Sequence, residues 1–122
     1  MEPEGGAVLF ISSIHAIVGR PGQIAYSGSK GAVTAAARAM AIELARRKIR
    51  VNVLSPGMVW TEMAEKALSH LTESQVQALK DSHPLGFGSP EDVARAAAFL
   101  LSPQNRWITA TDFVVDGGCS AQ

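Results

Sequence analysis

A tyrosine and a lysine four positions apart, Tyr26 and Lys30, are the side chains of this sequence best suited to chemistry. In a helix, positions i and i+4 lie one turn apart on the same face, with about 5–6 Å between their Cβ atoms. An ammonium group at that distance favours the charged form of a phenol. A phenol is otherwise a poor acid or base at neutral pH, so the pair predicts a proton-transfer group at the start of a helix.

The Tyr-Lys spacing alone is weak evidence, because an exposed helix with a half-buried ring and a solvated lysine has the same pattern. The surrounding sequence favours the catalytic interpretation. Ser13 stands thirteen positions before Tyr26, at the end of the apolar run 7–11, and a second apolar run, 51–54, ends in Ser-Pro-Gly. Open α/β sheets bind ligands at the carboxyl ends of their strands. The two strand ends are therefore expected to flank one crevice.

The elements that must position these residues alternate between strands and helices. Apolar runs predict strands at 7–12, 50–55 and about 111–115. Helices are expected at 24–47, in a short segment after Thr61, at 72–81 with Thr72 as a cap, and at 89–102, where Ser89 is an N-cap and Pro90 the first helical residue. Strands without internal alternation, joined by helices, indicate a parallel sheet covered on both faces. No linker or repeat interrupts the pattern, so residues 1–122 are expected to form a single α/β domain.

These segments together resemble the short-chain dehydrogenase/reductase family, and in particular its 3-oxoacyl-carrier-protein reductases. The resemblance covers nearly the whole chain and keeps the family's order. The matching segments are Ile11-Ser12-Ser13, Tyr26 to Lys30, Val51-Asn52-Val53 with Pro56-Gly57, Thr61, Pro84-Leu85-Gly86, Pro90 to Ala94, Phe99-Leu100-Leu101 and Val115 to Gly118. Two departures are a Gly-Phe-Gly turn at 86–88, where many members carry an arginine, and Ala110, where the family pattern has glycine.

Two segments of the family pattern are missing from this sequence. The family begins with a glycine-rich turn, T-G-x-x-x-G-x-G, and later carries an N-N-A-G segment whose asparagine joins the catalytic group; neither is present. The resemblance therefore implies the C-terminal catalytic half of such an enzyme. The corresponding fold is part of a doubly wound, Rossmann-like parallel sheet, with about three strands and covering helices. Without the other half, the strand at 7–12 would have one open, apolar edge.

The resemblance also implies catalytic roles for three side chains. Tyr26 would give a proton to a carbonyl oxygen, or take one from an alcohol, while hydride passes to or from C4 of a nicotinamide. Lys30 would favour proton loss from the phenol and hydrogen-bond the nicotinamide ribose. Ser13, rather than Ser12, would hold the substrate oxygen, because the family keeps thirteen positions between that serine and the tyrosine.

Together with Tyr26 and Lys30, four further residues are implied to bind the nicotinamide end of NAD or NADP. Pro56 and Gly57 would turn the backbone tightly beside the ring. Val59 would offer backbone groups to the carboxamide, and Thr61 would bond the carboxamide or the pyrophosphate. An N-cap role for Thr61 is an equally good account, and both are compatible. The choice between NAD and NADP depends on residues of the absent half.

Two functions remain open at this stage. The first is an NAD(P)-dependent oxidoreductase that interconverts a carbonyl and an alcohol, needs the N-terminal half for activity, and acts as a homo-oligomer or with that complementing half. The second is a truncated, non-catalytic interaction or oligomerisation module derived from such an enzyme. The substrate itself cannot be read from the variable section 58–88.

Composition argues against several other classes of function. The 11 basic and 11 acidic residues give a formal net charge of zero, so neither nucleic acid nor an anionic membrane is an expected partner. The basic run 46–50 is expected to close a helix. With no apolar stretch of membrane-spanning length and an acidic N-terminus, a cytoplasmic location is expected. One cysteine and three scattered histidines predict no metal site, and His15 is expected in an exposed loop, though it could line the substrate pocket.

Overall fold

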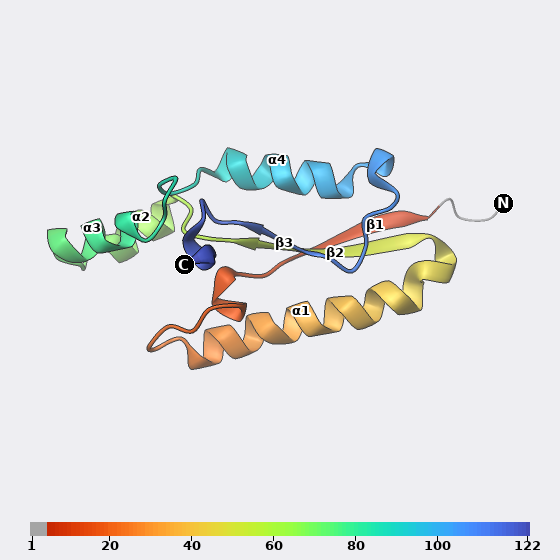
Figure 1. The fold of residues 1–122 in the computed structure, drawn as a ribbon, viewed down its shortest axis with the longest axis horizontal. Helices are drawn as coiled ribbons and strands as arrows, with labels where there is room; N and C mark the ends of the chain where they lie inside the picture. The colour runs from red at the N-terminus through yellow and green to blue at the C-terminus, as the bar shows by residue number, and fades with distance from the viewer. Residues whose placement is uncertain (1–4) are drawn as a thin grey trace.

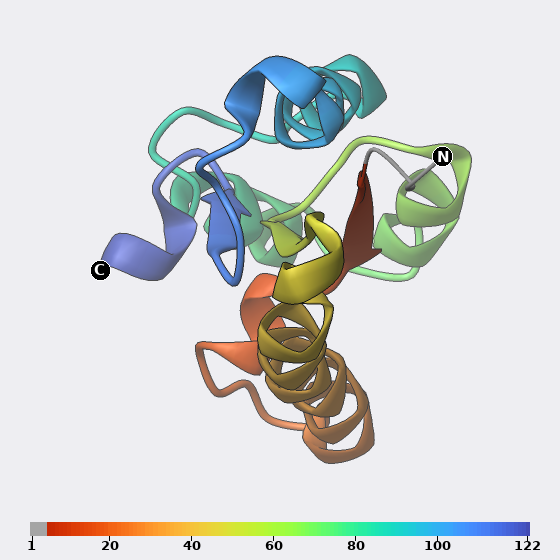
Figure 2. The same ribbon diagram turned by 90° about the vertical axis from the view of Figure 1, so that its right-hand side faces the viewer.

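The structure, a computed structural model, describes residues 5–122 as a three-layer α/β unit. Its centre is a parallel sheet in the order β1-β2-β3, formed by β1 (Gly6–Ile11), β2 (Ile49–Pro56) and β3 (Asp112–Val115). Helix α1 (Ile24–Leu44) covers one face of the sheet and α4 (Pro90–Leu101) covers the other, as Figures 1 and 2 show. The predicted α/β class and the parallel sheet are confirmed.

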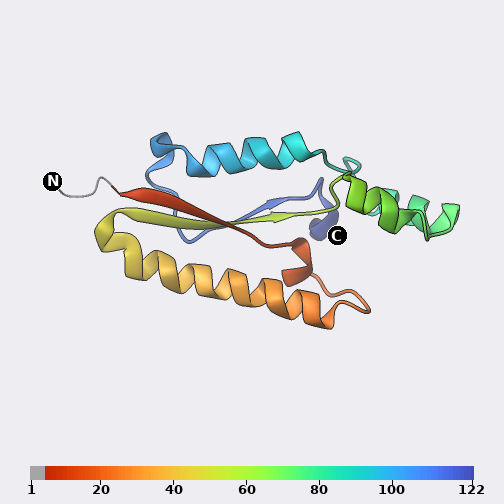
Figure 3. The ribbon, with the colours of Figure 1, turned by 180° about the vertical axis from the view of Figure 1, so that it is seen from behind.

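Two short helices lie outside the layered body. Helices α2 (Glu62–Leu68) and α3 (Glu73–Asp81) project beyond the end of the sheet where β2 finishes, and both side views agree on this (Figures 1 and 3). Thr72 caps α3 and Ser89 caps α4, each in a reciprocal capping box, and Pro90 is the first residue of α4. The local signals of the sequence thus located these helix starts correctly.

The first helix is shorter than the predicted 24–47. Helix α1 ends at Leu44 and the chain continues as a 3-10 turn over Ala45–Arg47. Lys48 then takes a left-handed conformation, with φ of 55°, and its N–H donates to the Ala45 carbonyl (2.9 Å). This turn reverses the chain so that β2 can start at Ile49, directly beneath the helix. The composition of this segment did not indicate that the α-helix would tighten into a 3-10 turn after Leu44.

The core between α1 and the sheet is built from small residues. Ala37 and Ala41 of α1 are buried against Val51 and Val53 of β2. Because alanine has the smallest side chain with a Cβ, the helix axis can approach the sheet closely, and larger side chains fill the periphery of the contact. The larger side chains at the periphery are Val8, Phe10, Met40, Leu44 and Ile49, and Ala110 also packs there.

Arg50 corrects one prediction, since it does not belong to the basic end of a helix. It lies in β2 and is only 9% exposed. Its guanidinium donates to the carbonyl oxygens of Leu100 (2.9 Å), Ser102 (3.0 Å) and Ile108 (3.0 Å). The first two belong to the C-terminal end of α4, where unpaired carbonyls carry partial negative charge. Arg50 therefore closes α4 from the sheet, whereas Arg46 and Arg47 lie in the 3-10 turn that follows α1.

Asn52, in β2, has a structural role. Its side-chain nitrogen donates to the Ile108 carbonyl (2.9 Å), and its side-chain oxygen accepts from the Thr111 N–H (3.1 Å). The side chain is 1% exposed, so these bonds satisfy a polar group that would otherwise be costly to bury. Asn52 thereby fixes the segment leading into β3, in which Ala110 has a left-handed φ of 59°.

Within residues 5–122 both outer strands of the sheet, β1 and β3, pair on one side only, and the open edge expected at the first strand is present. Within residues 5–122, β1 pairs with β2 alone, from Gly6 opposite Ile49 to Ile11 opposite Leu54. The other side of β1 has no strand beside it.

None of the helices in this same part of the chain combines the length and the apolar character needed to cross a membrane.

Candidate active site

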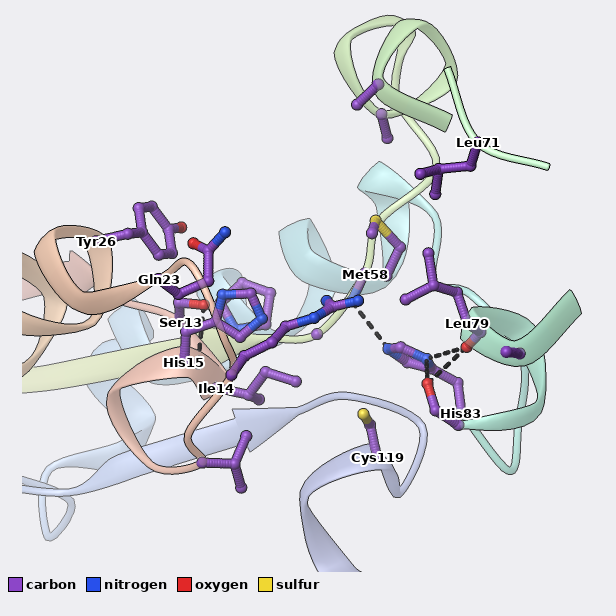
Figure 4. Close-up of a pocket in the computed structure, with 18 of the residues that line it drawn as sticks. Ser13, Ile14, His15, Gln23, Tyr26, Met58, Leu71, Leu79, His83 and Cys119 are labelled. Atoms are coloured by element: carbon purple, nitrogen blue, oxygen red, sulfur yellow. Dashed lines mark hydrogen bonds between the residues drawn. The ribbon is translucent and has the colours of Figure 1, made fainter. Parts of the chain in front are cut away.

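A cavity of about 960 Å³ opens at the carboxyl ends of the strands. It lies between the segment after β1, the start of α1, the turn after β2 and the two projecting helices (Figure 4). Five of the seven predicted site residues line it, namely Ser13, Tyr26, Pro56, Gly57 and Thr61. Lys30 and Val59 do not line it.

Tyr26 and Lys30 stand one turn apart near the start of α1. The Tyr26 side chain is 43% exposed toward the cavity. The Lys30 ammonium lies 5.8 Å from the centroid of the tyrosine ring and donates a hydrogen bond to the Ile11 carbonyl (3.2 Å). The last residue of β1 therefore anchors the lysine and keeps its positive charge beside the tyrosine ring.

The two serines after β1 have different surroundings. Ser12 is buried, donates to the Lys30 carbonyl (3.1 Å) and shares a hydrogen bond with Thr34 (3.1 Å), so it ties the strand end to α1. Ser13 lines the cavity. Its Oγ accepts the N–H of His15 (3.1 Å), which leaves the hydroxyl proton of Ser13 free to donate.

His15 lies closer to this group than the sequence indicated. Rather than facing solvent from a loop, it sits in a 3-10 turn and its ring meets that of Tyr26 edge to face, with centroids 5.6 Å apart. Burial, with a smaller contribution from the charge of Arg20, lowers the pKa of His15, so the imidazole is neutral at pH 7. Its Nδ1 is buried and has no hydrogen-bond partner in residues 5–122.

The turn after β2 is tightly packed at Gly57. A Cβ added there would lie 2.8 Å from the Cβ of Asp116 and 3.2 Å from Nε2 of His83. The Gly57 N–H donates to the Val115 carbonyl (3.0 Å), which continues the sheet into the turn. Only glycine fits this approach without displacing its neighbours.

The backbone N–H and C=O of Val59 point away from Gly88, the residue that bonds its two neighbours in the chain. Gly88 donates to the Met58 carbonyl (2.9 Å) and accepts from the Trp60 N–H (2.8 Å), forming an isolated parallel bridge at Val59. Because alternate residues of an extended chain direct their N–H and C=O groups to opposite sides, those of Val59 face the other way. They are available to a ligand lying beside the turn.

Thr61 has the structural role that was considered for it. It is the N-cap of α2, and its side-chain oxygen accepts the Ala64 N–H (3.1 Å). It also borders the cavity and is exposed, so its hydroxyl proton remains able to donate to a ligand. Capping and ligand binding are thus compatible at this position.

The far wall of the cavity is mainly apolar and was not predicted from the sequence. It comes from α2, α3 and the turn between them, and the contributing side chains include Met63, Ala64, Ala67, Leu71, Ala78 and Leu79. Cys119 also reaches the cavity, from the turn after β3. Spacing on such short helices carries little information about which face meets a ligand, so only the fold brings these residues together. Residues 5–122 contain no cluster of metal-ligating side chains.

Comparison with known proteins places this architecture in a family. The model for the family described as enoyl-(acyl carrier protein) reductase matches residues 1–120. Human 3-oxoacyl-[acyl-carrier-protein] reductase is 41% identical over 119 residues, an alignment that covers 97% of this chain and 46% of the human protein. The chain spans about half the length of the curated relatives it matches, with coverage of 54% for a relative from Xanthobacter autotrophicus.

Solved structures agree with the sequence comparison. The structure of ElxO with NADP bound superposes with a TM-score of 0.86 at 32% identity, covering 96% of this chain and 47% of ElxO. A 4-hydroxyisoleucine dehydrogenase complexed with NADH gives a TM-score of 0.89 at 34% identity, covering 96% of this chain and 48% of that enzyme. With a family model that matches almost its whole length, and a fold shared with about half of each solved neighbour, this chain belongs to the short-chain dehydrogenase/reductase family.

Proposed function

We propose that this chain carries the proton-transfer and nicotinamide-facing half of an NAD(P)-dependent oxidoreductase that interconverts a carbonyl and an alcohol. The observation that carries the proposal is that Ser13, Tyr26 and the Gly57 turn border one cavity, with the Lys30 ammonium beside the tyrosine ring. A proton donor, a hydrogen-bond donor and a flat backbone surface are the groups that carbonyl reduction by hydride requires.

The residues around the turn fit the nicotinamide end of a dinucleotide. Gly57 presents no side chain at the point where a Cβ would collide with Asp116 and His83, and Val59 has a free N–H and C=O beside it. These groups would bind the carboxamide, with Thr61 able to contribute its hydroxyl. The cofactor, when bound, supplies or accepts the hydride. The sequence has no glycine-rich turn for the pyrophosphate, so the other end of the dinucleotide needs a second chain or segment.

Tyr26 is proposed to exchange the proton with the substrate oxygen. In the direction of reduction, its hydroxyl gives a proton to the oxygen of the former carbonyl; in the direction of oxidation, the phenolate takes it from the alcohol. Ser13 donates a hydrogen bond to the same oxygen, because its Oγ accepts the His15 N–H and its hydroxyl proton remains available. Such a donor stabilises the negative charge that develops on the oxygen.

Lys30 is proposed to act on Tyr26 and on the cofactor ribose. Its ammonium lies 5.8 Å from the centroid of the Tyr26 ring, and two of its three N–H donors remain after the bond to Ile11. The ribose hydroxyls next to the nicotinamide are suitable acceptors for them. The bond to the strand end keeps the ammonium in place between the two, which reduces the entropy lost on binding.

The substrate is proposed to be a small carbonyl compound or the corresponding alcohol. The name of the human relative concerns 3-oxoacyl groups on a carrier protein, and the mainly apolar wall from α2 and α3 is compatible with an acyl chain. Arg20 is the one Asp, Glu, Lys or Arg side chain among the residues that line the cavity. The proposal therefore favours an uncharged reacting group.

A second candidate function is supported by the open edge of β1. A strand with six residues paired on one side only is a template for another strand. The chain could be a non-catalytic module that assembles through this edge, either with another copy or with the N-terminal half of a family member. Figure 3 shows β1 at the border of the sheet.

Calorimetric titration separates the two candidates. The purified chain should bind NADH and NADPH weakly or not at all, because half of the dinucleotide has no site. Adding an N-terminal half that carries the glycine-rich turn should produce binding together with reduction of a 3-oxoacyl thioester. Micromolar binding by the chain alone would contradict the need for the other half. A reconstituted assembly that binds cofactor and has no reductase activity would favour the interaction module.

A further inference from the structure

We propose that His83 is a positioning residue for the nicotinamide-facing turn, which comprises residues 56–60. This inference rests on the proposed function, because it assigns the turn to cofactor binding. His83 itself borders the cavity but acts through the backbone of Met58. It comes from the end of α3, twenty-five positions further along the chain, so a residue of the variable section sets the shape of the cofactor surface.

The contacts of the His83 ring are visible in Figure 4. The side chain is 6% exposed. Its Nε2 accepts the Met58 N–H (3.2 Å), and its Nδ1 lies 2.9 Å from the Leu79 carbonyl and 3.1 Å from the Ser82 hydroxyl. The ring of Phe87 packs against it edge to face, with centroids 5.3 Å apart. The hydrogen bonds at both ring nitrogens and the contact with Phe87 therefore fix the orientation of the His83 ring.

These partners fix one tautomer of the imidazole. A backbone N–H can only donate, so Nε2 must carry a lone pair toward Met58. A carbonyl can only accept, so the proton must be on Nδ1 and point to Leu79. The neutral ring protonated at Nδ1 satisfies both groups, and the other tautomer would face Met58 with a second N–H. The buried ring thus has a single favourable state.

The hydrogen bond from the Met58 N–H to His83 fixes the orientation of Met58, the residue before Val59. The Met58 carbonyl is held by the Gly88 N–H (2.9 Å), and His83 holds its N–H, so both backbone groups of Met58 are fixed from the segment after α3. Val59, the next residue, then directs its backbone N–H and C=O to the opposite side. Gly88 holds the peptides on both sides of Val59, so the separate contribution of His83 is to fix the preceding peptide, which joins Gly57 to Met58. Without His83, the Met58 N–H would lose this hydrogen bond and the Gly57 end of the turn would be less constrained.

Two polar substitutions separate this role from general support of the fold. In His83→Gln, the side-chain oxygen reaches the position of Nε2 and can accept the Met58 N–H. In His83→Asn, the shorter amide keeps a donor toward Leu79 and cannot reach Met58. His70→Asn, at an exposed position between α2 and α3, is the matched control.

Nuclear magnetic resonance on the chain alone gives a readout that needs no cofactor. Imidazole nitrogen shifts should report a proton on Nδ1 of His83. The Met58 amide should be protected from hydrogen exchange in the parent, in His83→Gln and in the control, and should lose that protection in His83→Asn. A proton on Nε2, or equal protection of Met58 in both His83 variants, would overturn the inference and leave the proposed function intact.

Kinetics of the reconstituted enzyme give the second readout. His83→Asn should raise KM for the nicotinamide cofactor about tenfold, the usual effect of one unmade buried hydrogen bond, while kcat changes much less. His83→Gln should restore KM to within about threefold of the parent. Equal KM values in the parent and in His83→Asn would overturn the positioning role. Failure of the proposed function would appear separately, as normal turnover in a Tyr26→Phe variant.

Discussion

The ammonium group of Lys30 lies 5.8 Å from the ring centroid of Tyr26 while donating a hydrogen bond to the last carbonyl of β1, that of Ile11. The strand end thereby sets the distance between a fixed positive charge and a phenol. This relationship links the sheet to the chemistry, because the end of β1 also leads to Ser13 on the cavity wall. The helix turn and the strand end have to be in place together for the group to form.

Removal of the Lys30 charge should impair two steps at once. In the active assembly, Lys30→Met should lower kcat by about tenfold or more, because the phenolate loses its neighbouring cation. KM for the cofactor should rise as well, since the ribose loses a donor. Steady-state kinetics with varied cofactor measure both effects. Lys80→Met, at an exposed position of α3, is the control and should behave as the parent. An unchanged kcat would show that Lys30 serves the fold alone.

Loss of the Arg50 guanidinium should destabilise the chain strongly. Arg50→Met keeps much of the side-chain volume and removes three hydrogen bonds to the carbonyls of Leu100, Ser102 and Ile108. Buried acceptors left without donors should lower the free energy of unfolding by about 3–5 kcal/mol. Urea unfolding followed by circular dichroism measures it. Arg47→Met, on the exposed end of α1, should change stability by no more than about 0.5 kcal/mol; similar losses for both variants would contradict the capping role.

Glycine at position 110 should stabilise the fold. Ala110 adopts a φ of 59°, a left-handed conformation that costs a residue with a Cβ about 1–2 kcal/mol. Part of the gain is offset by the greater freedom of glycine in the unfolded chain, so Ala110→Gly should add about 0.5–1 kcal/mol. Thermal unfolding should report a higher Tm. The matched change Ala98→Gly, inside α4, should lower stability by about 1 kcal/mol. A lower Tm for Ala110→Gly would show that the packing of the Ala110 methyl stabilises the fold by more than its left-handed backbone conformation costs.

Asp116 should make stability depend on acid pH. Partial burial alone would raise its pKa, but hydrogen bonds from Ser120 and Gly118 outweigh this and hold the pKa below the ordinary value of 3.8. A carboxyl whose pKa is lower in the folded state stabilises the fold above its unfolded pKa and loses that contribution as pH falls through the folded value. The advantage of the parent over Asp116→Asn should be present at pH 7 and shrink below pH 3.8. A difference that stays constant down to pH 2 would contradict it.

The sequence predicted the parts of the fold that depend on local signals. Capping residues located α3 and α4, and unbroken apolar runs located the three strands to within a residue or two. The turn that shortens α1 depends on how the chain must re-enter the sheet, which no local pattern records. Arg50 was misassigned for a related reason: its neighbours in sequence are basic, while its partners lie about fifty residues away.

The candidate site divides in the same way. Ser13, Tyr26 and the Gly57 turn follow strand ends or a helix start, so their meeting at one cavity could be predicted from the order of elements. The contacts of His15 with Tyr26, and of His83 with Met58, join side chains whose positions depend on turns and on the packing of α3. Histidine is common both in cores and on surfaces, so its type alone gave no indication of these contacts.

Turnover of a Tyr26→Phe variant in the reconstituted enzyme tests the central claim most directly. The substitution removes the hydroxyl and keeps the ring that packs on His15, so circular dichroism and cofactor affinity should match those of the parent. Loss of the transferable proton should reduce kcat by about 10²–10⁴-fold, the usual contribution of general acid–base catalysis. Near-normal kcat in this variant, with intact folding and cofactor binding, would contradict the assignment of Tyr26 as the proton donor and with it the proposed reductase site.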